Sequence, residues 1–334
     1  MDFKPVDSLI VERILSSGTK IKVGRLAQSR KGVFFQYEQS YVEQYGSLSP
    51  FALKPSTNLQ QAPQDPHKGL HGVFADSLPD GWGLLLQDRL FRRHGVLPNQ
   101  VTQMDRLALV GGRAMGALSY TPESIYQEEP NDFDIATLGL QAQALFNQTL
   151  NEEMDGQTQE VLHALLAVGS SGGARPKAQV YINASNPNEC RTRPSKGDTA
   201  WLVKFTSHNL ALKHEEGLCE AIYLSIADEI GLEAPQWKLI NAPEQSGARS
   251  WLAVERFDYI PQGDKASGRL HMHSACGLLD ADFRTPSLDY EDLIKVTRHL
   301  CQSPKAGQLQ FKRALFNLFA INQDDHSKNW SFLQ

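Results

Sequence analysis

The chain has 334 residues, which is enough for two domains or for one larger two-lobed unit with a sizeable core. Hydrophobic residues make up 41% and charged residues 21%, values that are ordinary for a globular protein and exclude collagen-like or broadly disordered classes. The formal net charge of -5 argues against broad electrostatic affinity for nucleic acid, although a local basic patch would escape this count. We expect any contact with DNA to come through a partner.

The cysteines and the N-terminal segment bear on the compartment. Cys190, Cys219, Cys276 and Cys301 stand far apart without a C-x-x-C pair, so they predict neither a zinc knuckle nor a disulfide framework. Reduced thiols are the simplest account. The N-terminal segment is charged throughout, and nowhere do about 18 apolar residues run together. We therefore expect a soluble, cytoplasmic protein.

The N-terminal part of the chain is predicted to be mixed α/β. Residues 33–45 are aromatic and β-branched with polar breaks, which favours a strand or a hairpin. A helix is predicted to begin near Pro79 or Asp80, with leucines and a phenylalanine on one face and Gly95 as its stop. Residues 104–120 predict a second helix, a glycine turn and a strand.

An acidic, proline-containing stretch at residues 121–132 predicts a linker. One later helix has Leu218, Ile222, Ile226 and Ile230 four apart, which is the spacing of an amphipathic helix. The order strands, helix, strands and then helices is that of a protein-kinase-like fold. After the predicted linker, the pattern predicts helices at 133–150 and 157–168, followed by strands at 177–183 and 199–205. The amphipathic helix at 214–232 comes next, then strands at 237–240 and 250–257, and the remainder is predicted to be mostly helical.

Charged and amide residues crowd residues 322–333 (NQDDHSKNWSFL), directly after a helical run. Phosphoryl transfer from ATP needs a carboxylate to orient the attacking hydroxyl, an amide or carboxylate oxygen on Mg²⁺ and a lysine on the phosphates. Asp324 and Asn329 have the D-x-x-x-x-N spacing of a kinase catalytic loop, and Lys328 between them could approach the transferred phosphoryl group. The alternative is an ordinary polar surface loop.

Two neighbours of Asp324 leave other readings open. Asp325 could also act as the base, although only Asp324 has the required interval to the asparagine. His326 could bind a metal, and with both aspartates it would allow a metal-dependent nuclease, but a lone histidine beside acids more often makes a structural hydrogen bond. His271 and His273, in HMH, could likewise share a metal, yet no nearby acid or cysteine completes a set.

Two further stretches could contact phosphate. Small residues at 169–177 (GSSGGARPK) would let backbone N–H groups approach a phosphate closely, but they match neither standard phosphate-loop pattern, and a flexible turn is the alternative. Lys204, in the apolar strand WLVKF, must reach solvent or an anionic partner. The lysine of a kinase strand holds phosphates and a helix glutamate, for which Glu216 and Glu220 are candidates.

Four stretches, SSGGARPK, WLVKF, LAVERFD and NQDDHSKNWSFL, together resemble the HipA family of bacterial serine/threonine kinases, the toxins of HipBA-type toxin–antitoxin pairs. FADSLPDGWG is similar to that family's F…LLPEG signature. The resemblance implies an α+β, protein-kinase-like two-lobed fold preceded by a small α/β N-terminal subdomain. We expect the subdomain at 1–125 and the kinase-like domain at 150–334, with a nucleotide-binding lobe at about 150–260 and a partial helical lobe at about 261–334.

The resemblance also implies roles for the matching residues. Asp324 would be the catalytic base, Asn329 a Mg²⁺ ligand and Lys204 the residue that holds the ATP phosphates. Backbone groups of Glu255 and Phe257 would meet the adenine. The phosphate-facing loop of the family would be formed by Ser170, Ser171, Gly172, Gly173, Ala174 and Lys177.

Regulation and partners follow from the same resemblance. Ser170 falls where such kinases carry a serine that they autophosphorylate, which ejects the loop and stops nucleotide binding; Ser171 is the neighbouring alternative. Added negative charge beside a phosphate site would be repulsive, so the physical logic agrees. The implied partner is a small helix-turn-helix antitoxin that supplies the DNA contacts, and the implied target is a translation factor such as an aminoacyl-tRNA synthetase.

The sequence departs from the kinase pattern at its end. Kinases need a second metal-binding aspartate beyond the catalytic loop, and Gln334 comes before any such residue. We therefore expect a kinase whose C-terminal helical lobe is truncated. The alternative is a catalytically inactive, kinase-like scaffold that binds a helix-turn-helix repressor and nucleotide.

Overall fold

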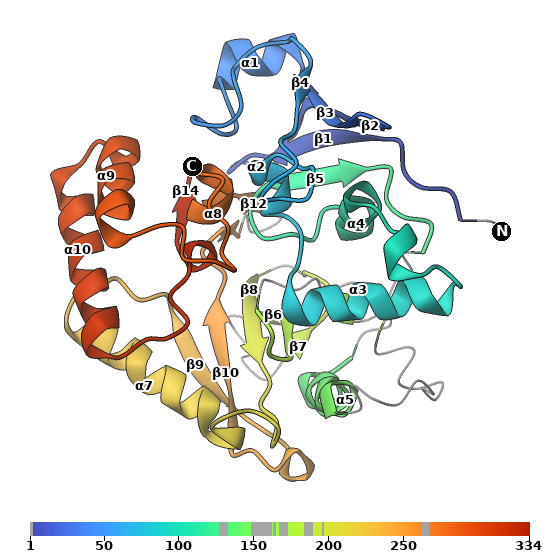
Figure 1. Ribbon diagram of the computed structural model, residues 1–334. Helices are drawn as coiled ribbons and strands as arrows, with labels where there is room; N and C mark the ends of the chain where they lie inside the picture. The colour runs from blue at the N-terminus through green and yellow to red at the C-terminus, as the bar shows by residue number, and fades with distance from the viewer. Residues whose placement is uncertain are drawn as a thin grey trace.

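The computed structural model describes residues 3–126, 133–147, 162, 165–166, 173–183, 190–195, 197–261 and 267–334. Within these ranges the chain forms two five-stranded antiparallel sheets and a group of helices towards its C-terminal end (Figure 1). This is the α+β fold that the sequence predicted. Among the helices described, none is long and apolar enough to cross a membrane.

The first sheet has the strand order β4-β3-β2-β1-β5. Alternate residues of its strand β1 are buried, and Leu9 and Val11 contribute to a core shared with helices α2 and α4, as expected for a strand with one solvated face. Its strands are β1 (Ser8–Ile14), β2 (Lys20–Ser29), β3 (Gly32–Tyr37), β4 (Gln60–Gln61) and β5 (Leu118–Thr121). The helices of this part are α1 (Gln39–Tyr45), α2 (Gly72–Ala75), α3 (Gly81–Arg93), α4 (Gln103–Val110) and the 3-10 turn η1 (Pro98–Gln100).

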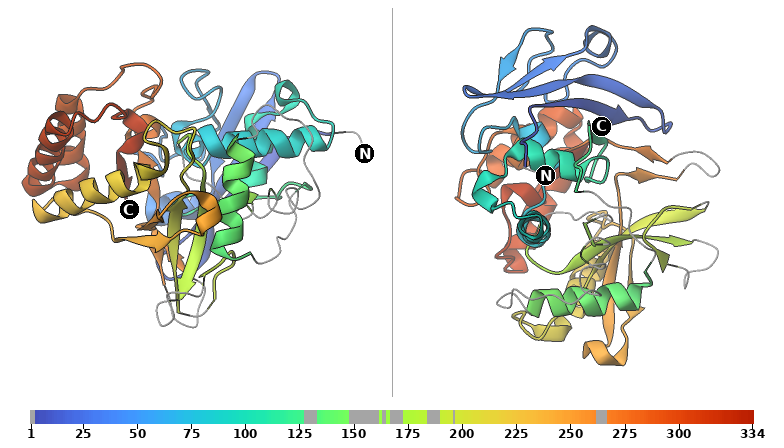
Figure 2. Two further views of the ribbon diagram at one scale, coloured as in Figure 1. Left: turned by 90° about the horizontal axis from the view of Figure 1, so that it is seen from below. Right: turned by 90° about the vertical axis from the view of Figure 1, so that its right-hand side faces the viewer.

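The second sheet has the strand order β7-β6-β8-β10-β9. Helices α5 and α7 cover its opposite faces (Figure 2): a Cβ at Gly139 of α5 would overlap the Trp251 ring, whereas one at Gly217 of α7 would meet Leu252. The elements are β6 (Lys177–Asn183), β7 (Cys190–Arg191), β8 (Asp198–Lys204), β9 (Trp237–Asn241), β10 (Ser250–Glu255), α5 (Ile135–Asn147), α7 (Glu216–Glu229) and the 3-10 turns η2 (Lys213–Glu215) and η3 (Glu244–Ser246).

Helix α3 connects the two sheets. It precedes strand β5 of the first sheet in the sequence, yet Trp82 and Leu86 near its start belong to the core of the second sheet. Further along, Leu90 and Phe91 pack with Leu109 of α4 in a separate small cluster. Figure 1 shows α3 lying between the two sheets. The N-terminal part is therefore packed against the second sheet rather than attached to it only by a linker.

In the C-terminal part, the loop of residues 322–330 has regular secondary structure on both sides. Helix α10 precedes this loop, and strand β14 follows it and pairs with β13, with Phe332 opposite His273. The elements are β11 (Tyr259–Ile260), β12 (Gly268–Arg269), β13 (Met272–Ser274), α8 (Ala275–Leu278), α9 (Tyr290–Cys301), α10 (Pro304–Phe319), the 3-10 turn η4 (Ser327–Asn329) and β14 (Ser331–Leu333).

Some predicted elements need correction. Strands β1 and β2 were not predicted, because apolar and polar residues do not alternate strictly in either strand. Residues 33–37 form most of β3 and the following residues form helix α1, so the prediction of a strand or hairpin over 33–45 was wrong for the second half of that stretch. The helix predicted at 157–168 lies largely outside the described residues. The predicted domain limits, 1–125 and 150–334, stay predictions.

The apolar side of helix α7 is exposed within the described chain, although an amphipathic helix normally buries such a side. Leu218, Ile222, Ile226 and Ile230 are 36–52% exposed. The helix instead buries Glu216, Gly217 and Ala221 against the second sheet, because small residues there allow a close approach of helix and strand. Several large side chains of α10 and the turn after it are exposed too: Phe311, Leu315, Leu318, Phe319 and Ile321.

Candidate active site

Lys204, at the end of strand β8, forms an ion pair with Glu220 of helix α7. Leu252 of β10, which faces α7, lies directly opposite Lys204 in the strand register, so the lysine faces α7 as well. Glu216, the other candidate partner, is bound by Arg175, with Nε 2.7 Å from Oε2. The structure therefore selects Glu220 as the partner, an arrangement equivalent to the strand lysine and helix glutamate of protein kinases.

Lys177, at the start of β6, lies directly opposite Lys204 in the neighbouring strand. Its side chain is nearly inaccessible, with 5% of the residue exposed. Burial and the charge of Lys204 lower the pKa of Lys177, Asp80 and Glu220 act in the opposite direction, and the resulting pKa is about 8. Two lysines and a glutamate thus converge where the segment 173–177 enters the sheet.

Asp80 links this segment to the loop near the C-terminal end. Its Oδ1 accepts a hydrogen bond from the backbone N–H of Gly173, and its Oδ2 lies 2.9 Å from Nζ of Lys328. Burial would raise the pKa of Asp80, but Lys328, the Gly173 N–H and Lys177 together outweigh this effect, and the pKa lies below its ordinary value. Sequence reasoning had treated Asp80 only as a helix start and as part of a family signature, and no local signal identified its distant partners.

The two aspartates in the loop of residues 322–330 have different surroundings. The side chain of Asp324 is 88% exposed, and its backbone carbonyl accepts a hydrogen bond of 2.5 Å from Nδ2 of Asn329. Oδ1 of Asp325 accepts a hydrogen bond of 2.8 Å from Nε1 of Trp330, and burial raises the pKa of Asp325. Asp324 is therefore the more exposed of the two aspartates and the one that an incoming hydroxyl can reach more freely.

The remaining predicted site residues are only partly placed. Ser170, Ser171 and Gly172 lie outside the described residues. Ala174 is described, and its Cα packs against Gly81. Glu255 ends strand β10, and its backbone N–H donates to the carbonyl of Gln236 over 2.8 Å, so this N–H is already engaged. Phe257, two residues further, is 47% exposed.

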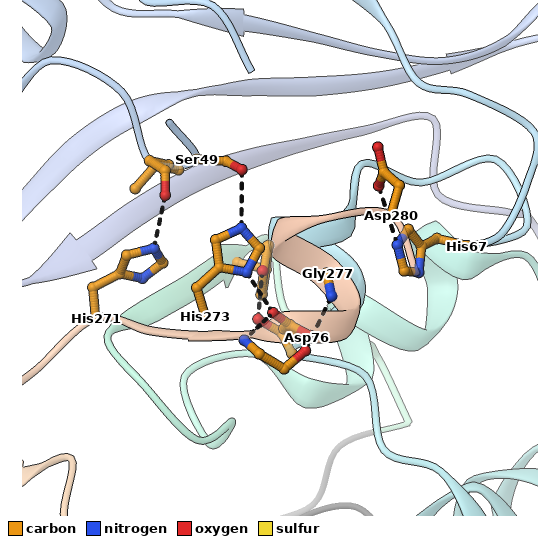
Figure 3. A network of polar contacts seen from close by, with 11 residues as sticks. Ser49, His67, Asp76, His271, His273, Gly277 and Asp280 are labelled. Atoms are coloured by element: carbon orange, nitrogen blue, oxygen red, sulfur yellow. Dashed lines mark hydrogen bonds and ion pairs between the residues drawn. The ribbon is translucent and has the colours of Figure 1, made fainter. Parts of the chain in front are cut away.

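The two histidines of the HMH stretch belong to a buried polar network (Figure 3). Nε2 of His271 lies 3.1 Å from the Leu48 carbonyl oxygen, and His273 lies between Asp76 and Ser49, 2.6 and 2.9 Å away. An acid does lie nearby, contrary to the expectation from sequence, but it binds His273 by a hydrogen bond. The Ser–His–Asp order is that of a hydrolase triad, yet Ser49 is only 1% exposed and no substrate could reach it.

A metal site built from side chains alone is not found in the described part of the chain. No group of three or more histidine, cysteine, aspartate or glutamate side chains is placed there to hold a metal ion. His326 Nε2 is 3.6 Å from Asp324 Oδ1, but Asp325 is turned to Trp330. These three residues therefore do not form the ligand set that the nuclease reading requires.

Comparisons with known proteins show which family the chain resembles. Residues 17–121 match the family model described as the HipA N-terminal domain, and residues 169–334 match the HipA-like C-terminal domain. A curated protein of Sinorhizobium fredii, named "Putative kinase Y4mE", is 25% identical over 327 residues, covering 93% of this chain and 71% of that protein. The two matched regions cover most of the chain and contain both sides of the contact between Asp80 and Lys328.

Proposed function

Because this chain belongs to the HipA family, we propose that it is a kinase that transfers the γ-phosphoryl group of ATP to a serine or threonine hydroxyl of a protein. The observation that carries the proposal is the ion pair between Lys204 and Glu220, beside Lys177 and close to the segment that begins at Gly173. A strand lysine held by a helix glutamate is the group that binds nucleotide phosphates in protein kinases.

The residues around this pair suit a triphosphate. Burial lowers the pKa of Lys177, and an anionic phosphate beside it would relieve the cost of its charge. Lys204 and Lys177 would hold the phosphates, together with backbone N–H groups of the segment that includes Gly173 and Ala174. The N–H of Gly173 itself already donates to Asp80, so the other N–H groups of the segment would make these contacts. In this proposal Glu255 and Phe257 supply backbone groups for the adenine; since the N–H of Glu255 is already bonded, its carbonyl would be the contact.

The loop would supply the groups at the transferred phosphoryl. Exposed Asp324 would accept the proton of the attacking hydroxyl, and Lys328 would approach the phosphoryl oxygens. Oδ1 of Asn329 would bind Mg²⁺, whose chemistry is to neutralise charge that develops on the phosphates. The hydrogen bond from Asn329 to the Asp324 carbonyl would hold the catalytic base and the metal ligand in fixed positions relative to each other.

Several further properties are proposed from the family alone. We propose that Ser170 is the autophosphorylation site, that the partner is a helix-turn-helix antitoxin and that DNA is contacted only through it. The target would be a translation factor such as an aminoacyl-tRNA synthetase, and the compartment the cytoplasm. The negative net charge is consistent with leaving the DNA contacts to a partner.

The test is phosphoryl transfer by the purified chain with Mg²⁺-ATP, followed as phosphate incorporated into the protein and into a general serine/threonine substrate. Asp324→Asn should abolish transfer while ADP affinity, measured by calorimetry, stays within about threefold. Asp325→Asn is the matched control, because asparagine keeps the acceptor for Trp330. Loss of transfer in the control alone would move the base to Asp325. Nucleotide binding without transfer by the unaltered chain would favour the inactive scaffold.

A further inference from the structure

Asp80 precedes helix α3 but does not cap it. An aspartate in this position normally accepts a hydrogen bond from an N–H of the first helical turn, which stabilises the helix by about 1 kcal/mol. In this chain no side-chain cap is formed by Asp80. Its two carboxylate oxygens bind groups 93 and 248 residues away in the sequence, the N–H of Gly173 and Nζ of Lys328. Asp80 thus makes two contacts with distant parts of the chain instead of capping the helix that follows it.

The two residues after Asp80 contact the same segment. A Cβ at Gly81, whose φ is +42°, would lie 2.6 Å from the carbonyl oxygen of Gly173 and 2.7 Å from Cα of Ala174. The backbone N–H of Trp82 donates to the Gly173 carbonyl over 3.0 Å, and its indole Nε1 donates to the Lys177 carbonyl over 3.1 Å. The stretch 80–82 therefore binds both ends of the segment 173–177.

The ion pair between Asp80 and Lys328 is largely shielded from water. The two side chains are 13% and 17% exposed, and the ammonium group lies 5.0 Å from the centre of the Phe283 ring. Charge pairs with low exposure are screened less by solvent and salt than surface pairs, so this contact restricts the position of Lys328. The position is relevant because Lys328 lies between Asp324 and Asn329 in the loop.

We infer that Asp80 is a positioning residue that joins the segment 173–177 to Lys328, so that the N-terminal part of the chain sets the geometry of the nucleotide site. Asp80 itself touches none of the reacting groups. The catalytic consequence rests on the proposed kinase function, whereas the geometric link does not.

Two substitutions separate the parts of this role. Asp80→Asn keeps an acceptor for the Gly173 N–H but removes the charge that holds Lys328. Asp80→Ser keeps a side chain that favours a helix start and is too short for both partners, so it can preserve α3 while it breaks the link. Asp88→Asn is the matched control, since Asp88 lies in α3 and the substitution breaks its ion pair of 2.6 Å with Arg106 of α4.

The first measurement does not depend on catalysis. Hydrogen exchange at the Gly173 amide, measured without nucleotide, should become at least tenfold faster in Asp80→Ser than in the unaltered chain or in Asp88→Asn. An unchanged exchange rate at Gly173 in a folded Asp80→Ser variant would overturn the link, whether or not the protein transfers phosphate.

The second measurement is kinetic. Asp80→Asn should lower kcat about tenfold or more while the Kd for ADP changes by less than about threefold, because misplaced groups act at the reacting centre. In a Lys328→Met background the same substitution should cause less than a twofold further loss, since residues that act as a unit are not additive. Fully additive losses would contradict the positioning role. An unaltered chain that transfers no phosphate would refute the proposed function and leave the exchange result to decide the link.

Discussion

Nδ1 of His273 lies 2.6 Å from Oδ2 of Asp76, although the two residues are 197 positions apart in the sequence. Asp76 follows helix α2, and His273 lies in strand β13, next to the strand that ends the loop of residues 322–330. The same carboxylate accepts hydrogen bonds from the backbone N–H and the hydroxyl of Ser274 (Figure 3). A second contact between the N-terminal part and the C-terminal part thus supports the one made by Asp80.

Asp76→Ala should lower the free energy of unfolding by about 3 kcal/mol or more, because it leaves three donors in a buried region without their acceptor. Urea denaturation measures the loss. Asp292→Ala is the control: the Asp292 side chain is 57% exposed on α9, and its removal should cost less than about 1 kcal/mol. A loss for Asp76→Ala that is as small as the loss expected for the control would show that the Asp76 network adds no stability.

Gly81→Ala should disturb the contact between α3 and the segment 173–177. A methyl group at this position would lie 2.6 Å from a backbone oxygen, and no side-chain movement could relieve this clash. We therefore expect the free energy of unfolding to fall by about 2 kcal/mol or more. Gly95→Ala provides the comparison, because Gly95 also has a positive φ (+75°) but no atom within 4 Å of the added carbon. If thermal unfolding shows the same loss for both, backbone strain alone accounts for the effect.

Lys204→Met and Glu220→Gln should each lower kcat/KM for ATP by roughly 100-fold, because one removes the phosphate ligand and the other removes the group that orients it. Steady-state phosphoryl transfer measures both variants. Lys295→Met, a substitution in an exposed ion pair on α9, is expected to change kcat/KM by less than about twofold. Retained activity in Lys204→Met would remove this lysine from the proposed mechanism.

The stability contributed by Lys177 should depend on pH in alkaline solution. Its pKa is about 8 in the folded chain, below the ordinary 10.5, so between these values the unfolded chain holds a proton that the folded chain has lost. The free energy of unfolding, relative to that of Lys177→Met, should therefore rise as pH increases from about 8 to 10.5, by up to about 3 kcal/mol. Below pH 8 the difference should be constant. Urea denaturation of both chains at several pH values measures this difference in unfolding free energy. A difference that stays constant from pH 8 to 10.5 would show that the pKa of Lys177 is not lowered in the folded chain.

Local patterns were sufficient where each element depends on its own residues. Helix α3 was expected to begin near Asp80 and begins at Gly81, and strands β6, β8, β9 and β10 lie where the apolar stretches predicted them. Strands β1 and β2 were missed because apolar and polar residues do not alternate strictly in them. In β1 the isoleucines Ile10 and Ile14 lie on the less buried face and Arg13 on the buried one, and in β2 Gly24 follows the buried Val23. Helix α7 was predicted, but its exposed apolar side was not, since a periodic pattern identifies a shared face without identifying what covers it.

For the site, the sequence by itself determined the chemical groups and their spacing along the chain: the aspartate and asparagine five positions apart, the lysine in an apolar strand and the small residues before Lys177. Only the tertiary structure decided that Lys204 pairs with Glu220 rather than Glu216, that Asp324 rather than Asp325 is exposed, and that Asp80 joins Gly173 to Lys328. Spacing and periodicity describe neighbours along one element, whereas these choices depend on strand register and on the packing of segments up to 248 residues apart.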